Sequence, residues 1–96
     1  MPVQEMLTVF TYDVSDNRRR RRIARLLEDE STRVQRSVFE ARMSRRRASR
    51  LGRRIEDLLG PGDSLRVYAV GADGMARSEV YGDAAPFESA EGFWVV

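Results

Sequence analysis

Residues 6–14 predict a strand that is apolar on both of its faces, and this run restricts the fold more than any other feature of the chain. β-Branched and aromatic residues dominate it. One face carries Leu7 and Val9, and the other carries Met6 and Phe10. A strand of this kind belongs in the centre of a sheet that is covered on each side. The rest of the chain must therefore supply a cover for both faces.

The positive charge of the chain is concentrated in one segment. Residues 18–54 contain fifteen arginines and four acids, a balance of +11, whereas residues 1–17 carry −3 and residues 55–96 carry −6. The codon composition of a GC-rich genome would explain why all basic residues are arginines, so the inference rests on their distribution. Such asymmetry is typical of a surface for an anionic partner, and guanidinium groups bind phosphates by bidentate hydrogen bonds. We expect this segment to bind nucleic acid.

Length and composition limit the chemistry. The 96 residues predict a single domain over residues 1–96, with a core at 6–70 and an edge strand and tail at 75–96. Cysteine and histidine are absent, which excludes a disulfide framework, a thiolate zinc site and any catalytic arrangement that needs histidine. No apolar run approaches the length of a membrane span, so we expect a cytoplasmic protein without membrane contact.

The pattern along the chain predicts the order βαββαβ with an additional C-terminal strand. The first half of the chain is expected to form a strand at 6–14, a helix capped by Ser15 or Asp16 that runs to about residue 30, and antiparallel strands at 33–35 and 38–43. A helix at 45–59 capped by Ser44 and a strand at 65–70 are expected next. A turn at 71–74, an edge strand at 77–81 and a terminal strand at 93–96 complete the prediction. This order is the α+β, ferredoxin-like arrangement, in which two helices cover one face of an antiparallel sheet. The other face needs a second copy as cover. We therefore expect a homodimer packed sheet to sheet, with the terminal strand docked on the sheet edge of the other copy.

Four segments of the chain carry a resemblance to a known family. They are Tyr-Asp-Val-Ser-Asp at 12–16, the arginine-rich helix after it, Thr-Arg-Val-Gln-Arg-Ser-Val-Phe-Glu-Ala-Arg at 32–42 and Asp-Ser-Leu-Arg-Val-Tyr at 63–68. These segments are similar to the Cas2 family of small CRISPR-associated proteins. The resemblance implies a homodimer that binds duplex DNA and bridges copies of the Cas1 integrase during spacer acquisition. Members of the family also act as magnesium-dependent nucleases on single-stranded RNA or on DNA.

The resemblance also implies the site residues. Asp13 matches the catalytic, metal-binding aspartate, with Mg²⁺ or another divalent cation as cofactor and one Asp13 from each subunit near the two-fold axis. A single carboxylate is a poor magnesium site, so a turn cap or an arginine partner for Asp13 remains the alternative. Tyr12 and Phe39 match neighbours of the site, and we favour core or interface roles for them over base stacking. The candidates for nucleic-acid binding are Arg18, Arg19, Arg20, Arg22, Arg33, Arg46, Arg50 and Arg53.

Three functional classes follow from these expectations. The chain is an architectural subunit that holds duplex DNA by its backbone, a magnesium-dependent endonuclease, or a non-catalytic ferredoxin-like RNA-binding module outside the family. The first two need the same positive surface and the same dimer, so the sequence does not separate them. RNA-binding modules carry exposed aromatic residues on their strands, whereas the charge here lies on helices. The third class is therefore the least favoured.

Overall fold

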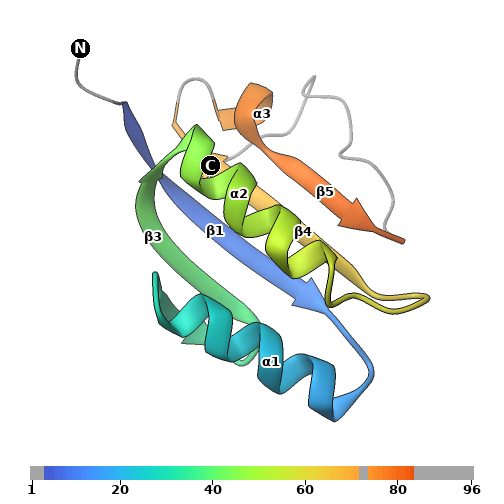
Figure 1. Cartoon of the computed structure of the whole chain (residues 1–96). Coiled ribbons are helices and arrows are strands. Elements are labelled where there is room, and N and C mark those ends of the chain that lie inside the picture. The colour runs from blue at the N-terminus through green and yellow to red at the C-terminus, as the bar shows by residue number, and fades with distance from the viewer. Residues whose placement is uncertain (1–3, 72–73, 84–96) are drawn as a thin grey trace.

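A five-stranded antiparallel sheet with two helices on one face forms the fold of this computed structural model, which describes residues 4–71 and 74–83 (Figure 1). The elements are β1 (Glu5–Asp13), α1 (Asn17–Glu28), β2 (Thr32–Gln35), β3 (Val38–Ser44), α2 (Arg45–Glu56), β4 (Ser64–Val70), α3 (Gly74–Arg77) and β5 (Glu79–Gly82). The strand order β2-β3-β1-β4-β5 puts β1 in the centre, between β3 and β4. The predicted α+β, ferredoxin-like class is confirmed. The dimer stays a prediction.

Both long helices begin at the predicted caps. The Asp16 carboxylate accepts a hydrogen bond from the Arg19 amide at 2.9 Å, and the Ser44 hydroxyl accepts one from the Arg47 amide at 3.2 Å. These contacts satisfy amides that a helix start leaves without an intrahelical partner. Both helices end slightly earlier than predicted, at Glu28 and Glu56. None of the helices among the described residues is long and apolar enough to cross a membrane.

The segment after β4 differs from the prediction. Residues 74–77 form the short helix α3, and the edge strand begins at Glu79 and not at residue 77. The Ser78 hydroxyl gives the reason, because it donates to the Gly74 carbonyl at 2.7 Å and accepts from the Ala69 amide at 2.9 Å. Such side-chain bonds to the backbone compete with strand pairing. The predicted terminal strand at 93–96 lies outside the described residues.

The core lies between the sheet and the two long helices. Phe10 in β1 is fully buried there, together with Ile23 and Leu27 of α1 and Ile55 of α2. Burial alternates along β1, so every second side chain enters this core. This alternation arises because successive side chains of a strand point to opposite faces of the sheet. The buried apolar residues of both helices thus form the surfaces that cover one face of the sheet.

Neither α1 nor α2 covers the other face, which we call the open sheet face (Figure 1). The strand register assigns to it Leu7, Val9, Thr11, Asp13, Val38, Glu40, Arg42, Ser64, Arg66, Tyr68, Val70 and Val80. Its apolar side chains are partly buried by their neighbours in the sheet and none of them is fully buried. The central strand is therefore apolar toward a surface that the described part of one chain does not close.

Helix α2 approaches β5 closely at Gly52. A Cβ atom at this position would lie 2.8 Å from a ring carbon of Tyr81. The Tyr81 hydroxyl donates to the Glu79 carboxylate at 2.7 Å, and the Ser49 hydroxyl donates to the same carboxylate at 3.2 Å. These bonds hold the ring against the helix. Glycine is needed at this position because a side chain would prevent the close contact between α2 and the Tyr81 ring.

We predict that Gly52→Ala destabilises the protein by about 1–3 kcal/mol, because the added methyl group overpacks the contact with the Tyr81 ring. Alanine normally stabilises a helix interior relative to glycine by about 1 kcal/mol. The same substitution in a Tyr81→Ala background should therefore be neutral or stabilising. Urea unfolding of the four proteins of this cycle measures both effects. A more stable Gly52→Ala protein in the otherwise unchanged chain would contradict the packing argument.

Candidate functional site

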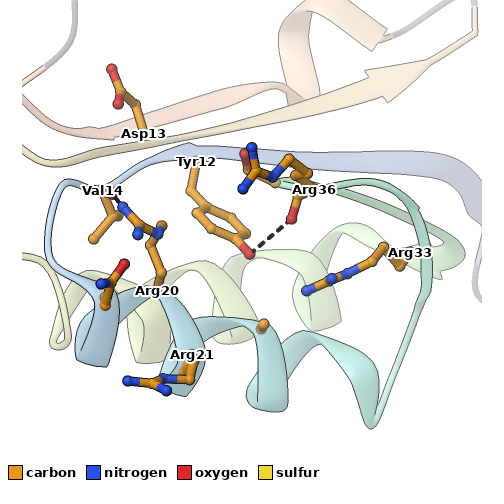
Figure 2. Close-up of a pocket in the computed structure, with 10 residues that line it drawn as sticks. Tyr12, Asp13, Val14, Arg20, Arg21, Arg33 and Arg36 are labelled. Atoms are coloured by element: carbon orange, nitrogen blue, oxygen red, sulfur yellow. Dashed lines mark hydrogen bonds between the residues drawn. The ribbon is translucent and has the colours of Figure 1, made fainter.

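The last two residues of β1 point to opposite faces of the sheet. Tyr12 faces the helices and is 6% exposed, whereas Asp13 is exposed on the open sheet face. Figure 2 shows the Asp13 carboxylate directed away from the Tyr12 ring, from Arg20 and from Arg33. None of the ion pairs among residues 4–71 and 74–83 involves Asp13. The carboxylate and the nearby arginines of one chain therefore do not converge.

A hollow lined by arginines lies at the end of β1, and we call it the arginine basin. Its volume is ≈ 690 Å³. Its lining comes from the end of β1 and the residue after it, from α1, from β2 and from the β2–β3 connection. The lining residues are Tyr12, Asp13, Val14, Asn17, Arg20, Arg21, Ala24, Arg33, Arg36 and Ser37. The single acid in this lining directs its carboxylate to the other face (Figure 2). The basin is therefore strongly positive, as a phosphate-binding hollow must be.

Helical periodicity explains which residues of α1 enter the basin. Asn17, Arg20, Arg21 and Ala24 stand at i, i+3, i+4 and i+7, so they share one face of the helix. Ala24 is nearly buried, and its small side chain leaves space at the inner end of this face. The five-arginine run thus sends only part of its charge toward the basin.

Arg33 lines the basin and lies over one of two stacked aromatic rings. The Tyr12 and Phe39 rings have centroids 6.3 Å apart and an interplanar angle of 20°. The guanidinium carbon of Arg33 lies 5.1 Å from the centroid of Phe39, within the range of a cation–π contact. Its ion pair with Glu28 is long, at 4.0 Å, and both side chains are about half exposed, so the pair is weak. Phe39 is fully buried, which confirms a core role and leaves no surface for base stacking.

Tyr12 is a neutral hydrogen-bond donor. Burial raises the pKa of Tyr12 above its ordinary value, and the positive charge of Arg33 offsets only part of this rise. The hydroxyl donates a hydrogen bond to the Arg36 carbonyl at 3.5 Å (Figure 2). Tyr12 therefore stays protonated at neutral pH and cannot serve as a general base.

Backbone carbonyls hold Arg20 in place. Its Nη1 donates to the Val14 carbonyl at 2.9 Å and to the Ser15 carbonyl at 3.0 Å. A carbonyl carries no net charge, so these contacts orient the guanidinium without neutralising it. Arg20 thus brings its full positive charge to the basin.

Arg19 has a structural partner. Its Nε donates at 2.8 Å to Asp63, which is 2% exposed. The same carboxylate accepts from the Gly60 amide at 2.7 Å and from the Ser15 amide at 3.4 Å. Burial alone would raise the pKa of Asp63, but the hydrogen bonds from Gly60, Arg19 and Ser15 outweigh it and hold the pKa below the usual value for an aspartate. Asp63 is therefore ionised, and it pairs with a residue that the sequence suggested for nucleic-acid binding.

The other predicted arginines lie on different surfaces. Arg22 lines a groove between α1 and α2 together with Arg25, Leu26, Asp29, Arg54 and Leu58. Arg50 lines a neighbouring hollow in which Glu30 pairs with Arg47 at 2.8 Å. Arg18, Arg46 and Arg53 are exposed. Of the eight predicted arginines, Arg20 and Arg33 line the basin, and the role of all eight in nucleic-acid binding stays a prediction.

Sequence reasoning missed three residues of this region. Arg21 and Arg36 line the basin, and Asp63 holds Arg19. The i, i+4 relation of Asn17 and Arg21 is a signal that would have selected Arg21. Nothing in the sequence places the β2–β3 turn, and with it Arg36, beside α1. Nothing in the sequence brings Asp63 to Arg19 either, so both residues could be recognised only in the folded structure.

The described part of one chain does not form a complete magnesium site around Asp13. The described residues contain no group of three or more acidic side chains that could hold a metal ion. Thr11, Ser64, Arg66 and Asp83 line a small hollow with Asp13 on this side of the strand. The Asp83 carboxylate there already accepts a hydrogen bond from the Gly62 amide at 2.8 Å. Magnesium takes a full shell of oxygen ligands in near-ideal octahedral geometry and usually keeps several waters, so an ion at Asp13 would need ligands beyond the described side chains.

Comparisons with known proteins agree with this architecture. The profile of the family described as CRISPR associated protein Cas2 matches residues 6–77. A CRISPR-associated endoribonuclease Cas2 from Chloroflexus aurantiacus is 35% identical over 95 residues, which cover 95% of this chain and 100% of the relative. One from Thermus thermophilus is 38% identical over 77 residues, which cover 79% and 82%. The crystal structure of a hypothetical protein from Thermus thermophilus has a TM-score of 0.66 and 40% identity, and covers 72% of this chain and 85% of that one. The resemblance seen in the sequence is confirmed, and the chain belongs to the Cas2 family of CRISPR-associated proteins.

Proposed function

We propose that this chain is a CRISPR adaptation subunit that binds nucleic-acid backbones as a homodimer and bridges Cas1 integrase dimers during spacer acquisition. The arginine basin carries the proposal, because four guanidinium groups around one hollow suit a phosphodiester. Family membership supports the role in CRISPR adaptation. The described residues place these arginines on α1 and on a short hairpin, and contacts of this kind position a backbone without reading bases.

The open sheet face is the surface that we assign to the homodimer. It runs across the centre of the sheet and combines apolar residues such as Leu7 and Val9 with charged residues of both signs, Glu40 and Arg42. A two-fold axis would place each patch against its own copy, so acids and arginines of the two chains complement each other. The same packing would bring the two Asp13 carboxylates to one side of the dimer.

We predict a dimer at micromolar concentration that Val9→Asp converts into a folded monomer, because the substitution places a charge in the middle of the apolar contact. Val34→Asp is the matched control, since Val34 is 51% exposed on the edge strand β2. Sedimentation equilibrium measures the state of association, and circular dichroism verifies the fold. A monomeric parent protein, or loss of the dimer in both variants, would remove the basis for this interface.

Magnesium-dependent cleavage is the second candidate function, and the names of the relatives favour it, since several are called endoribonucleases. Two Asp13 carboxylates across a two-fold axis would supply more ligands than the described residues of one chain provide. A magnesium ion held there would lower the pKa of a bound water and offset charge on the phosphate. Without histidine in the chain, the side chains contribute ligands and phosphate contacts and no imidazole base.

We predict that Asp13→Asn reduces magnesium-dependent cleavage to background and leaves the fold and duplex binding nearly unchanged. Asp13 is exposed and makes no ion pair among residues 4–71 and 74–83, so the substitution removes a ligand without disturbing packing. Asp29→Asn, at the exposed end of α1, controls for the change in net charge. Cleavage of labelled RNA and DNA is measured with and without magnesium. Undiminished cleavage by Asp13→Asn would assign the activity to another group or to a contaminant.

The structure weakens the case for an RNA-binding module that stacks bases on its sheet. Such modules need exposed aromatic residues on their strands. Phe10, Tyr12 and Phe39 are buried on the helix side of the sheet. Among the described aromatic residues, only Tyr68 lies on the open sheet face, where it is partly buried. Backbone contact is therefore the better account of the positive charge.

We predict that duplex binding falls steeply with salt and is nearly independent of sequence. If about five arginines reach phosphates, log affinity should change with log salt at a slope of about −4 to −5. Two triple variants remove equal charge, one in the basin (Arg21, Arg33 and Arg36 to Gln) and one on α2 (Arg46, Arg50 and Arg53 to Gln). Both should flatten the slope for unrelated sequences, and the basin triple should lose more affinity because its arginines converge.

Fluorescence anisotropy across a salt series measures both the slope and the affinity. A slope near zero in the parent protein, or a loss confined to one DNA sequence, would redirect the arginines to protein contacts. Equal losses in the two triple variants would contradict the special role of the basin.

A further inference from the structure

We infer that Asp63 is a positioning residue for the arginine basin, and that it acts through the Val14–Asp16 loop to orient Arg20 toward a phosphate. This inference deepens the proposed function and rests on it. Asp63 itself lies outside the lining of the basin. Its effect must therefore pass through the residues that it holds.

Asp63 joins its own turn to two parts of the chain that are distant in the sequence, the start of α1 with its preceding loop and the end of β5. Its carboxylate accepts from Ser15 in the loop after β1, from Arg19 in α1 and from Gly60 after α2. Its own carbonyl accepts from the Asp83 amide at 2.9 Å, at the end of β5. A buried carboxylate with three donors keeps its charge and its orientation. Asp63 is thus held in a fixed position next to β4, the strand that pairs with the end of β1.

The Val14–Asp16 loop connects Asp63 to the basin. The Ser15 amide is bound to Asp63, while the carbonyls of Ser15 and of its neighbour Val14 hold the Arg20 guanidinium. Asp16 caps α1 from the same loop. Asp63 and Arg20 therefore bind the same three-residue loop, one through an amide and the other through carbonyls. A shift of the loop displaces the guanidinium from the basin.

Because Asp63 is negatively charged, a variant without this charge distinguishes two possible roles of the residue. Asp63→Asn removes a negative charge and releases Arg19. If Asp63 only neutralised Arg19, the variant would bind nucleic acid more tightly. If Asp63 positions Arg20, the same variant binds more weakly in spite of its additional positive charge. The two roles predict opposite changes in affinity.

Gly60 offers a second perturbation that changes no charge. A Cβ atom on Gly60 would lie 2.7 Å from the guanidinium carbon of Arg19. Gly60→Ala therefore displaces the Arg19 guanidinium from Asp63 without adding or removing an ionisable group. Tyr81→Phe is the control, because it removes a hydrogen bond to Glu79 on another part of the sheet.

The experiment measures duplex affinity across a salt series for the parent protein and for Asp63→Asn, Gly60→Ala, Arg20→Gln, Tyr81→Phe and the Asp63→Asn/Arg20→Gln double variant. We expect Asp63→Asn and Gly60→Ala to weaken binding and to reduce the slope by about 0.9, the value for one phosphate contact. The double variant should lose no more than Arg20→Gln, because both substitutions act through the same guanidinium. Tyr81→Phe should bind as the parent does. Tighter binding by Asp63→Asn, or additive losses in the double variant, would overturn the inference.

Hydrogen exchange at the Ser15 amide separates this inference from the proposed function. If the parent protein fails to bind duplex DNA, the proposed function fails, and the exchange rate still tests the positioning. We expect faster exchange of Ser15 in Asp63→Asn and in Gly60→Ala than in Tyr81→Phe. If Asp63→Asn does not fold, Gly60→Ala decides alone. Unchanged exchange of Ser15 in a folded variant would show that Asp63 does not hold the loop.

Discussion

At the end of β1, the alternating direction of the side chains separates the Asp13 carboxylate from the arginines of the basin. Tyr12 faces the helices and Asp13 faces the open sheet face, because adjacent side chains of a strand point to opposite sides. The described residues of one chain complete the lining of the arginine basin, whereas the Asp13 carboxylate faces a surface that this part of the chain leaves open. The basin and the Asp13 carboxylate are thus separate candidate sites. A metal ion at the second would need ligands beyond the described side chains.

The five consecutive arginines are not a uniform positive patch. A helix turns by about 100° per residue, so five consecutive side chains cannot all share one face. Arg19 pairs with buried Asp63, Arg20 and Arg21 enter the basin, and Arg22 lies in the groove toward α2. Positive charge at a helix start opposes the helix dipole, and two acids offset this unfavourable placement. Asp63 neutralises one guanidinium, and Asp16 caps the helix. The Arg19 amide lowers the pKa of Asp16, as do the charges of Arg18 and Arg19.

Much of the fold could be predicted from the sequence because the relevant forces are local. The doubly apolar run marked the central strand, Asp16 and Ser44 marked the helix starts, and the apolar stripes of α1 and α2 marked the helix faces that are buried. The short helix α3 was missed because a serine side chain, bound to the backbone on both sides, decides that turn. No periodic pattern reports such a contact. Tyr12 and Phe39 were expected to be core or interface aromatics, and their burial confirms the core role.

The sequence by itself determined which elements form, where the positive charge is concentrated, and that Asp13 ends the central strand. Only the tertiary structure decided which arginines meet, because their convergence depends on how α1 sits against the β2–β3 connection. The turn brings Arg36 and α1 brings Arg21 to a hollow that no spacing in the sequence describes. Asp63 is the clearest case, since it stands 44 residues from its partner Arg19. A contact over such a separation is set by strand pairing and helix packing, and it exists only once the sheet has formed.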